Sequence, residues 1–88
     1  MPYISRKDRM KLDPKIEDLS KAISSLGPKI LGNLNYVITQ LVRQTNPSSY
    51  SDYASLVGML ETMKLEFYRR ATAPYEDKKI EENGDVYN

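Results

Sequence analysis

The sequence has 88 residues and a net charge of +1, and it contains neither cysteine nor histidine. A chain of this length suits one small domain, and these absences exclude disulfides, thiolate nucleophiles, the usual zinc sites and the commonest general base. Because no apolar run is long enough for a membrane span or a secretory signal, we expect a cytoplasmic protein. Because the central residues of most enzyme mechanisms and any metal signature are missing, we expect that it is not an enzyme and has no cofactor or metal.

The charges are unevenly distributed along the chain. Residues 1–15 carry five basic and two acidic side chains, a net charge of +3, whereas residues 76–88 carry two basic and five acidic side chains, a net charge of −3. The two ends can therefore attract each other, within one chain or between subunits. A general nucleic-acid binder would show a basic excess over the whole domain, so that function is disfavoured.

The N-terminal third is predicted to contain an arm followed by a helix. Residues 1–12 are predicted to form an arm, in which Ser5 can cap one short helical turn. Asp13 and Pro14 form a helix start signal, because Asp accepts from free amide groups and Pro suits the first helical position. The predicted helix runs from Pro14 to Leu26, where Gly27 and Pro28 stop it. Its apolar stripe consists of Ile16, Leu19, Ile23 and Leu26.

A second helix is predicted from a cap at Asn33 to about Gln44. Its apolar residues recur at steps of three and four and include Leu34, Val37, Ile38, Leu41 and Val42. The β-branched run at 37–39 leaves a strand as the alternative, but a strand would require an apolar spacing of two. We therefore expect this segment to be a helix of the core.

After a polar loop over 44–49, a long helix is predicted from Asp52 to about Ala73, capped by Ser51. Pro74 should kink or break it before a shorter helix continues to about Glu82, and residues 84–88 form a tail. The sequence thus predicts an all-α protein, a single helical domain with a long proline-kinked C-terminal helix, in an oligomeric helical assembly. Association is expected because a monomer of this size is only marginally stable.

A group of aromatic and basic residues surrounds Pro74. On a continuous helix Tyr68, Tyr75 and Lys79 lie along one side, and Arg69 and Arg70 flank them. Such a group could stack a base on a ring while guanidinium groups hold phosphate oxygens. The plainer alternative is that these side chains only form ion pairs, such as Glu66–Arg70, on a solvent-exposed helix face.

Four segments carry a resemblance to known proteins: 33–39 (NLNYVIT), 60–61 (LE) with 64–70 (KLEFYRR), 73–79 (APYEDKK) and 82–87 (ENGDVY). They resemble a family of small proteins from tailed bacteriophages and prophages. In size, helical pattern and phage setting that family is similar to viral anti-defence sponge proteins, which sequester cyclic dinucleotides of the bacterial CBASS immune system.

The resemblance implies a phage-encoded homo-oligomer, for instance a tetramer, which binds a cyclic dinucleotide such as 3′3′-cGAMP in the infected host without cleaving it. Two stacked bases and two phosphate contacts supply roughly 5–12 kcal/mol before association costs, short of the roughly 12 kcal/mol net for nanomolar capture. We therefore expect a ligand enclosed between subunits. The candidate roles are stacking by Tyr36, Tyr68 or Tyr75, phosphate contact by Arg69, Arg70 and Lys79, and base-edge reading by Asn35 and Thr39.

The alternative hypothesis is a protein-interaction module. It would dock on a host or virion protein through the helix after Pro74 and the acidic tail. Nucleotide capture should survive removal of residues 84–88, whereas docking should not.

Overall fold

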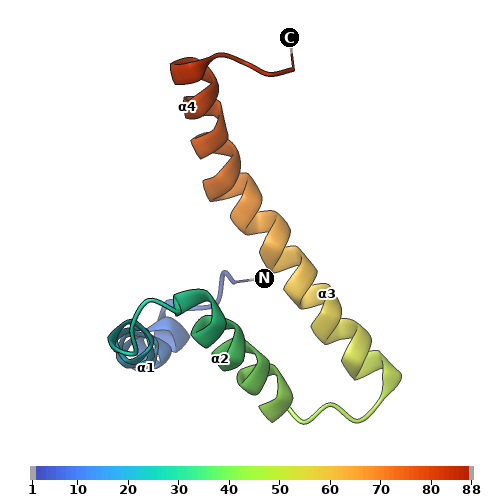
Figure 1. The fold of residues 1–88 in the computed structure, drawn as a ribbon. Coiled ribbons are helices and arrows are strands. Elements are labelled where there is room, and N and C mark those ends of the chain that lie inside the picture. The colour runs from blue at the N-terminus through green and yellow to red at the C-terminus, as the bar shows by residue number, and fades with distance from the viewer. Residues whose placement is uncertain (1, 88) are drawn as a thin grey trace. The chain divides into compact units, whose positions relative to one another are not determined.

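The computed structural model describes residues 2–87, and in this range every regular element is helical, which confirms the all-α class (Figure 1). The elements are α1 (Arg6–Ser25), α2 (Ile30–Gln44), α3 (Tyr50–Phe67), the π-helical turn η1 (Tyr68–Thr72) and α4 (Ala73–Asn83). By its internal contacts the chain divides into two units, 2–49 and 50–87, which are described separately. The single-domain organisation stays a prediction.

Helix α1 begins earlier than the sequence predicts. The side chain of Ser5 accepts a hydrogen bond from the backbone N–H of Asp8 at 3.2 Å, which satisfies one of the unpaired donors of the first turn. The helix then continues through Asp13 and Pro14. The predicted arm over 1–12 is therefore wrong for residues 6–12, because an interior proline removes only one backbone hydrogen bond and the rest of the helix compensates.

Helix α2 also begins before its predicted start. The N–H of Asn33 donates to the carbonyl of Lys29 at 3.1 Å, so Asn33 lies inside the helix and does not cap it. The chain re-enters a helix almost directly after Gly27, whose φ of 104° makes the turn. The predicted end at Gln44 is confirmed, and the strand alternative for 37–39 is excluded.

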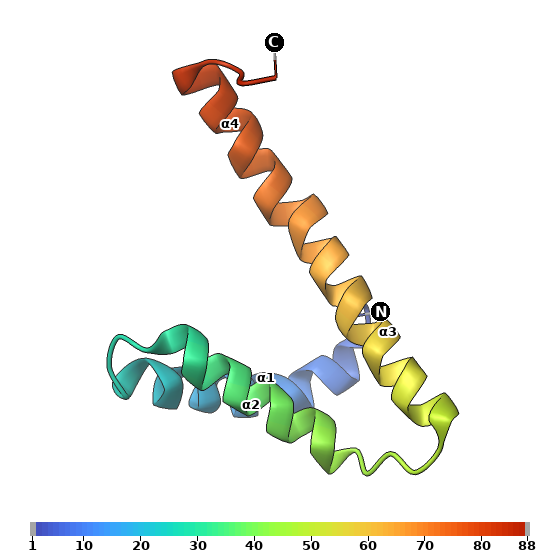
Figure 2. The ribbon, with the colours of Figure 1, turned by 45° about the vertical axis from the view of Figure 1, so that its right-hand side comes forward.

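Helices α1 and α2 lie side by side and form a helical hairpin (Figure 2). Within residues 2–87 only Ile23, 8% exposed, is buried, and it lies on α1 facing α2. The apolar stripes predicted for the two helices therefore do face each other. However, they form a surface that is largely open and not a closed core.

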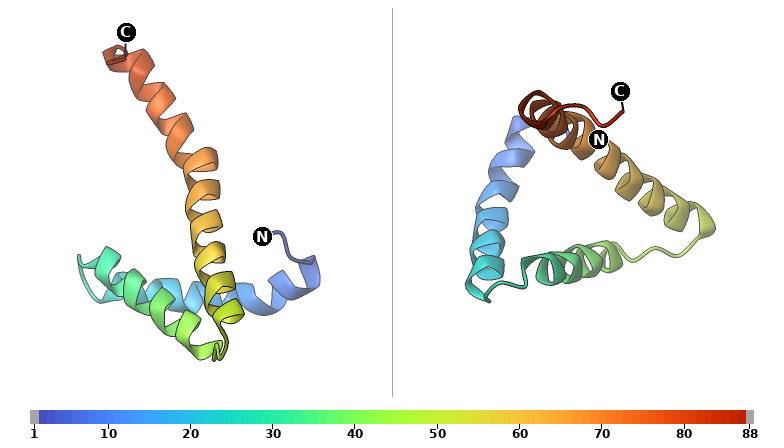
Figure 3. Two further views of the ribbon diagram at one scale, coloured as in Figure 1. Left: turned by 90° about the vertical axis from the view of Figure 1, so that its right-hand side faces the viewer. Right: turned by 45° about the horizontal axis from the view of Figure 1, so that its top comes forward.

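The second unit is a continuous helical rod made of α3, η1 and α4 (Figure 3). The predicted interruption takes the form of a π-helical turn before Pro74, and the helix does not break there. In this turn the N–H of Ala73 donates to the carbonyl of Tyr68, five residues earlier. A wider turn accommodates Pro74, because its ring crowds the carbonyl four residues before it and it has no N–H to donate.

The C-terminal helix ends where the sequence predicts. Gly84 adopts a φ of 90° and its N–H donates to the carbonyl of Ile80 at 2.8 Å. In the tail, the N–H of Tyr87 donates to Asp85 Oδ1 at 2.8 Å, while the side chains of Val86 and Tyr87 are about nine-tenths exposed. Across residues 2–87, no helix combines the length and the apolar character that crossing a membrane requires.

Candidate functional site

The structure places the eight predicted ligand residues in two groups. Asn35, Tyr36 and Thr39 lie on α2, in the first unit. The second unit carries Tyr68, Arg69 and Arg70 on η1 and Tyr75 and Lys79 on α4. Each group is thus a local arrangement within its own unit.

The α2 group is polar and accessible. The hydroxyl of Thr39 lies 3.4 Å from Asn35 Oδ1, one helical turn away, and donates to it. The neighbouring Tyr36 is 64% exposed. This side of the helix could present an amide, a hydroxyl and a ring to a planar ligand, as base-edge reading and stacking require.

On η1 the two arginines have different surroundings. Arg69 Nη2 lies 2.8 Å from Glu66 Oε1, an ion pair between positions three apart. Arg70 is exposed and makes no ion pair within residues 2–87, so the predicted Glu66–Arg70 pair does not form. The π-helical turn changes the spacing of side chains here, which the sequence pattern could not show.

On α4 the cation of Lys79 already has two neighbours. Its Nζ lies 3.2 Å from Glu82 Oε1 and 5.6 Å from the centroid of the Tyr75 ring. The predicted alignment of Tyr75 and Lys79 along one helix face is therefore confirmed. A phosphate at this position would compete with the carboxylate of Glu82 for the ammonium group.

The three cations do not line the hollow that η1, α4 and the tail form in the second unit. Tyr68 alone of the predicted residues lines a hollow of about 400 Å³ between η1, α4 and the tail. Its other polar lining residues are Tyr87 and the carboxylates Glu76, Asp77 and Asp85. A hollow with this charge suits a cationic group and repels a phosphate.

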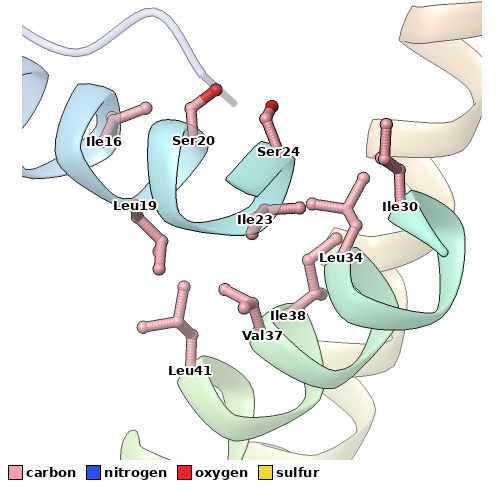
Figure 4. A pocket seen from close by; sticks show the side chains of 10 residues that line it. All are labelled: Ile16, Leu19, Ser20, Ile23, Ser24, Ile30, Leu34, Val37, Ile38 and Leu41. Atoms are coloured by element: carbon pink, nitrogen blue, oxygen red, sulfur yellow. The ribbon is translucent and has the colours of Figure 1, made fainter. Parts of the chain in front are cut away.

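Sequence reasoning missed an open groove between α1 and α2, because it interpreted most of the lining residues only as the apolar stripes of two packed helices. The groove has a volume of about 400 Å³ (Figure 4). The apolar periodicity of the two helices was the available signal, but periodicity does not tell whether a face is covered by the same chain. The residues that line the groove are Ile16, Leu19, Ser20, Ile23, Ser24, Ile30, Leu34, Val37, Ile38 and Leu41.

The part of the chain that the structure describes offers no grouping of three or more acidic, cysteine or histidine side chains suited to a metal ion. Its chemical groups are phenols, guanidinium and ammonium cations, carboxylates and amides, mostly on helices and mostly exposed. These groups can bind and orient a ligand through stacking and charge-assisted hydrogen bonds.

These features define a small all-α protein with an open helical hairpin and a helical rod that bears aromatic and cationic side chains. A family model described as Domain of unknown function (DUF6899) matches residues 1–86, and the chain belongs to this family. No curated protein and no solved structure matches the chain.

Proposed function

We propose that this protein is a self-associating, non-enzymatic helical protein that captures a cyclic dinucleotide immune signal, such as 3′3′-cGAMP, in the cytoplasm of a phage-infected bacterium. The observation that carries the proposal is an unpaired cation, Arg70, two residues after the exposed Tyr68 on the same π-helical turn. These two side chains provide groups that such a ligand could contact, and self-association is the expectation for a chain of this size. The immune ligand itself comes from the resemblance to phage proteins.

The role of Arg70 follows from its surroundings. Its guanidinium group is exposed and has no carboxylate partner within residues 2–87, so a phosphate could bind it without displacing an ion pair. Tyr68, two residues earlier on the same turn, is exposed and offers a ring for stacking. Arg69 and Lys79 would each have to exchange a carboxylate for a phosphate.

The electrostatics of one unit alone disfavour an anion, because Glu66 and Glu82 already pair with two of the three cations. The proposal therefore requires a second copy of the chain to complete the site. A nearly symmetric cyclic dinucleotide suits a site between two copies related by a two-fold axis.

Calorimetric titration of the full chain with 3′3′-cGAMP tests the proposal. We expect saturable binding, and chromatography after heat denaturation should recover the nucleotide chemically intact. Absence of binding would reject this ligand, and recovery of a cleaved or altered nucleotide would reject sequestration without catalysis.

Replacement of the unpaired arginine tests the assigned role. Arg70→Ala should weaken nucleotide binding about 10- to 150-fold, because one charge-assisted hydrogen bond to phosphate contributes about 1.5–3 kcal/mol. Arg43→Ala, which removes an arginine from the last turn of α2, is the matched control and should leave the affinity unchanged. Equal losses in both variants would show that Arg70 contributes only through net charge.

A protein-interaction module remains the second candidate, and the acidic hollow beside the tail favours it. Glu76, Asp77 and Asp85 line this hollow together with the apolar side chains of Ile80 and Val86, a combination that suits a basic, partly apolar peptide segment. Removal of residues 84–88 should abolish docking on a host or virion protein in a pull-down. Nucleotide capture measured in parallel should survive this deletion.

A further inference from the structure

The junction between α4 and the tail contains an asparagine that is followed by glycine. Of the five asparagines in the sequence, only Asn83 precedes a glycine. Asn83 is the last residue of α4, Gly84 is its C-cap, and both residues are exposed. Water can therefore reach the side-chain amide and the backbone that follows it.

This pair of residues suits a spontaneous ring closure. The backbone nitrogen of Gly84 attacks Cγ of Asn83, a C–N bond forms, and the side-chain amide leaves as ammonia with the proton that the backbone nitrogen gives up. Water then opens the five-membered succinimide at one of its two carbonyls, which yields aspartate or isoaspartate without an oxidant or a cofactor. Glycine favours the first step, because no Cβ obstructs the approach of the nitrogen and its backbone is unrestricted.

In the structure the attacking nitrogen is engaged in a hydrogen bond. The N–H of Gly84 donates to the carbonyl of Ile80 at 2.8 Å, which closes the last turn of α4. The nitrogen cannot give up this proton and attack Cγ until the bond opens. Helix ends open far more readily than helix interiors, and no residue of α4 is buried, so this turn should open locally.

The other asparagines that the structure describes each lack a requirement of the reaction. Asn33 and Asn35 lie inside α2 and precede residues with a Cβ. Asn46 precedes Pro47, which has no backbone N–H to lose. These three positions are therefore internal controls for Asn83.

We propose that Asn83 is a site of spontaneous deamidation, and that the hydrogen bond from Gly84 to Ile80 limits its rate. The product adds one negative charge to residues 76–88, whose net charge is already −3. Isoaspartate also lengthens the main chain between α4 and the tail. The hollow between η1, α4 and the tail has lining residues on both sides of this junction, so its shape and charge change with the modification.

Peptide mapping of the full chain by mass spectrometry tests the site. The protein is incubated at mildly alkaline pH and digested at acidic pH, where ring closure is slow, and fragment ions locate each exchange of an amide for a carboxyl group. Asn83 should react several times faster than Asn33, Asn35 or Asn46, and isoaspartate should be among its products. Equal rates at the four positions, no product at Asn83, or aspartate as its sole product would overturn the proposal.

A blocked peptide of residues 80–87 tests the role of the hydrogen bond. The peptide is too short to form a stable helix in water, so its Gly84 N–H is not held by a carbonyl. The full chain should react about 2- to 13-fold more slowly than the peptide, which corresponds to the net contribution of one backbone hydrogen bond. Equal rates would contradict control by this bond, and so would a chain that reacts only in urea concentrations that unfold it.

Two glycine variants test the role of the residue after Asn83. Gly84→Ala should deamidate several times more slowly than the unchanged chain, although it weakens the end of α4, because its Cβ hinders the approach of the nitrogen. Gly58→Ala is the matched control, since Gly58 lies in α3 and an added Cβ would meet no atom within 4 Å. It should react at the unchanged rate, whereas an unchanged or faster rate in Gly84→Ala would overturn the assigned mechanism.

Discussion

Two glycines on helical elements have opposite backbone requirements. Gly84 ends α4 with a φ of 90°, a conformation that side chains with a Cβ rarely adopt, whereas Gly32 lies inside α2. Gly84→Ala should therefore lower the free energy of unfolding by about 1 kcal/mol. Gly32→Ala should raise it by about 0.4–1 kcal/mol, because alanine favours the helix and its Cβ would meet no atom within 4 Å.

Urea denaturation monitored by circular dichroism at one fixed protein concentration measures both changes. The matched pair controls for the general effect of adding a methyl group. A destabilised Gly32→Ala variant would indicate that another chain packs closely against this side of α2.

The contacts of single charged residues show which interactions the sequence predicts and which it does not. The alignment of Tyr75 with Lys79 follows from their spacing of four, and the structure confirms it. The partner of Glu66 is Arg69 and not the predicted Arg70, because the π-helical turn alters the positions of the side chains. The spacing of apolar residues along the sequence does not reveal such a local change of helical geometry.

At the scale of elements, Pro74 and the π-helical turn before it form one feature. Pro74→Ala restores an N–H and removes the ring, so η1 should relax toward an α-helix and the helix signal at 222 nm should rise. Tyr68 would then rotate relative to Tyr75, and the affinity for 3′3′-cGAMP should fall.

Pro14→Ala is the control for this prediction, because Pro14 also lies inside a helix but far along the chain from the aromatic and cationic residues. It should increase helicity without changing nucleotide affinity. Unchanged affinity in Pro74→Ala would show that the π-helical turn does not position Tyr68 for binding.

The helix starts illustrate why element boundaries were the weakest predictions. Two predicted start signals, Asp13 with Pro14 and the cap Asn33, lie inside helices α1 and α2. In α1 the earlier cap at Ser5 already begins the helix, and propagation through Pro14 requires no new nucleus, although the proline removes one backbone hydrogen bond. The predicted helix ends, about Gln44 and about Glu82, lie within one residue of the observed ends at Gln44 and Asn83, because the polar loop that follows Gln44 and Gly84 are strong stops.

At the scale of the whole molecule, association should link stability to concentration. If the folded chain is stabilised by a second copy, mass action favours the folded assembly as protein concentration rises. For a dimer of this size we expect the melting temperature to rise by about 3–5 °C for each tenfold increase in concentration. Thermal melts monitored by circular dichroism over a hundredfold range measure this dependence, and a constant melting temperature would contradict association.

The sequence by itself determined the all-α class, the approximate number of helices, the apolar stripes on α1 and α2 and the end of α4. These features depend on interactions between residues a few positions apart, which the order of the residues encodes directly. Only the tertiary structure decided that the stripes form an open groove, that a π-helical turn precedes Pro74, and that Arg69 and Lys79 pair with carboxylates while Arg70 does not. These outcomes depend on which side chains meet in space and on what remains uncovered, and a helical periodicity is the same whether its apolar face is closed by the same chain or left for another.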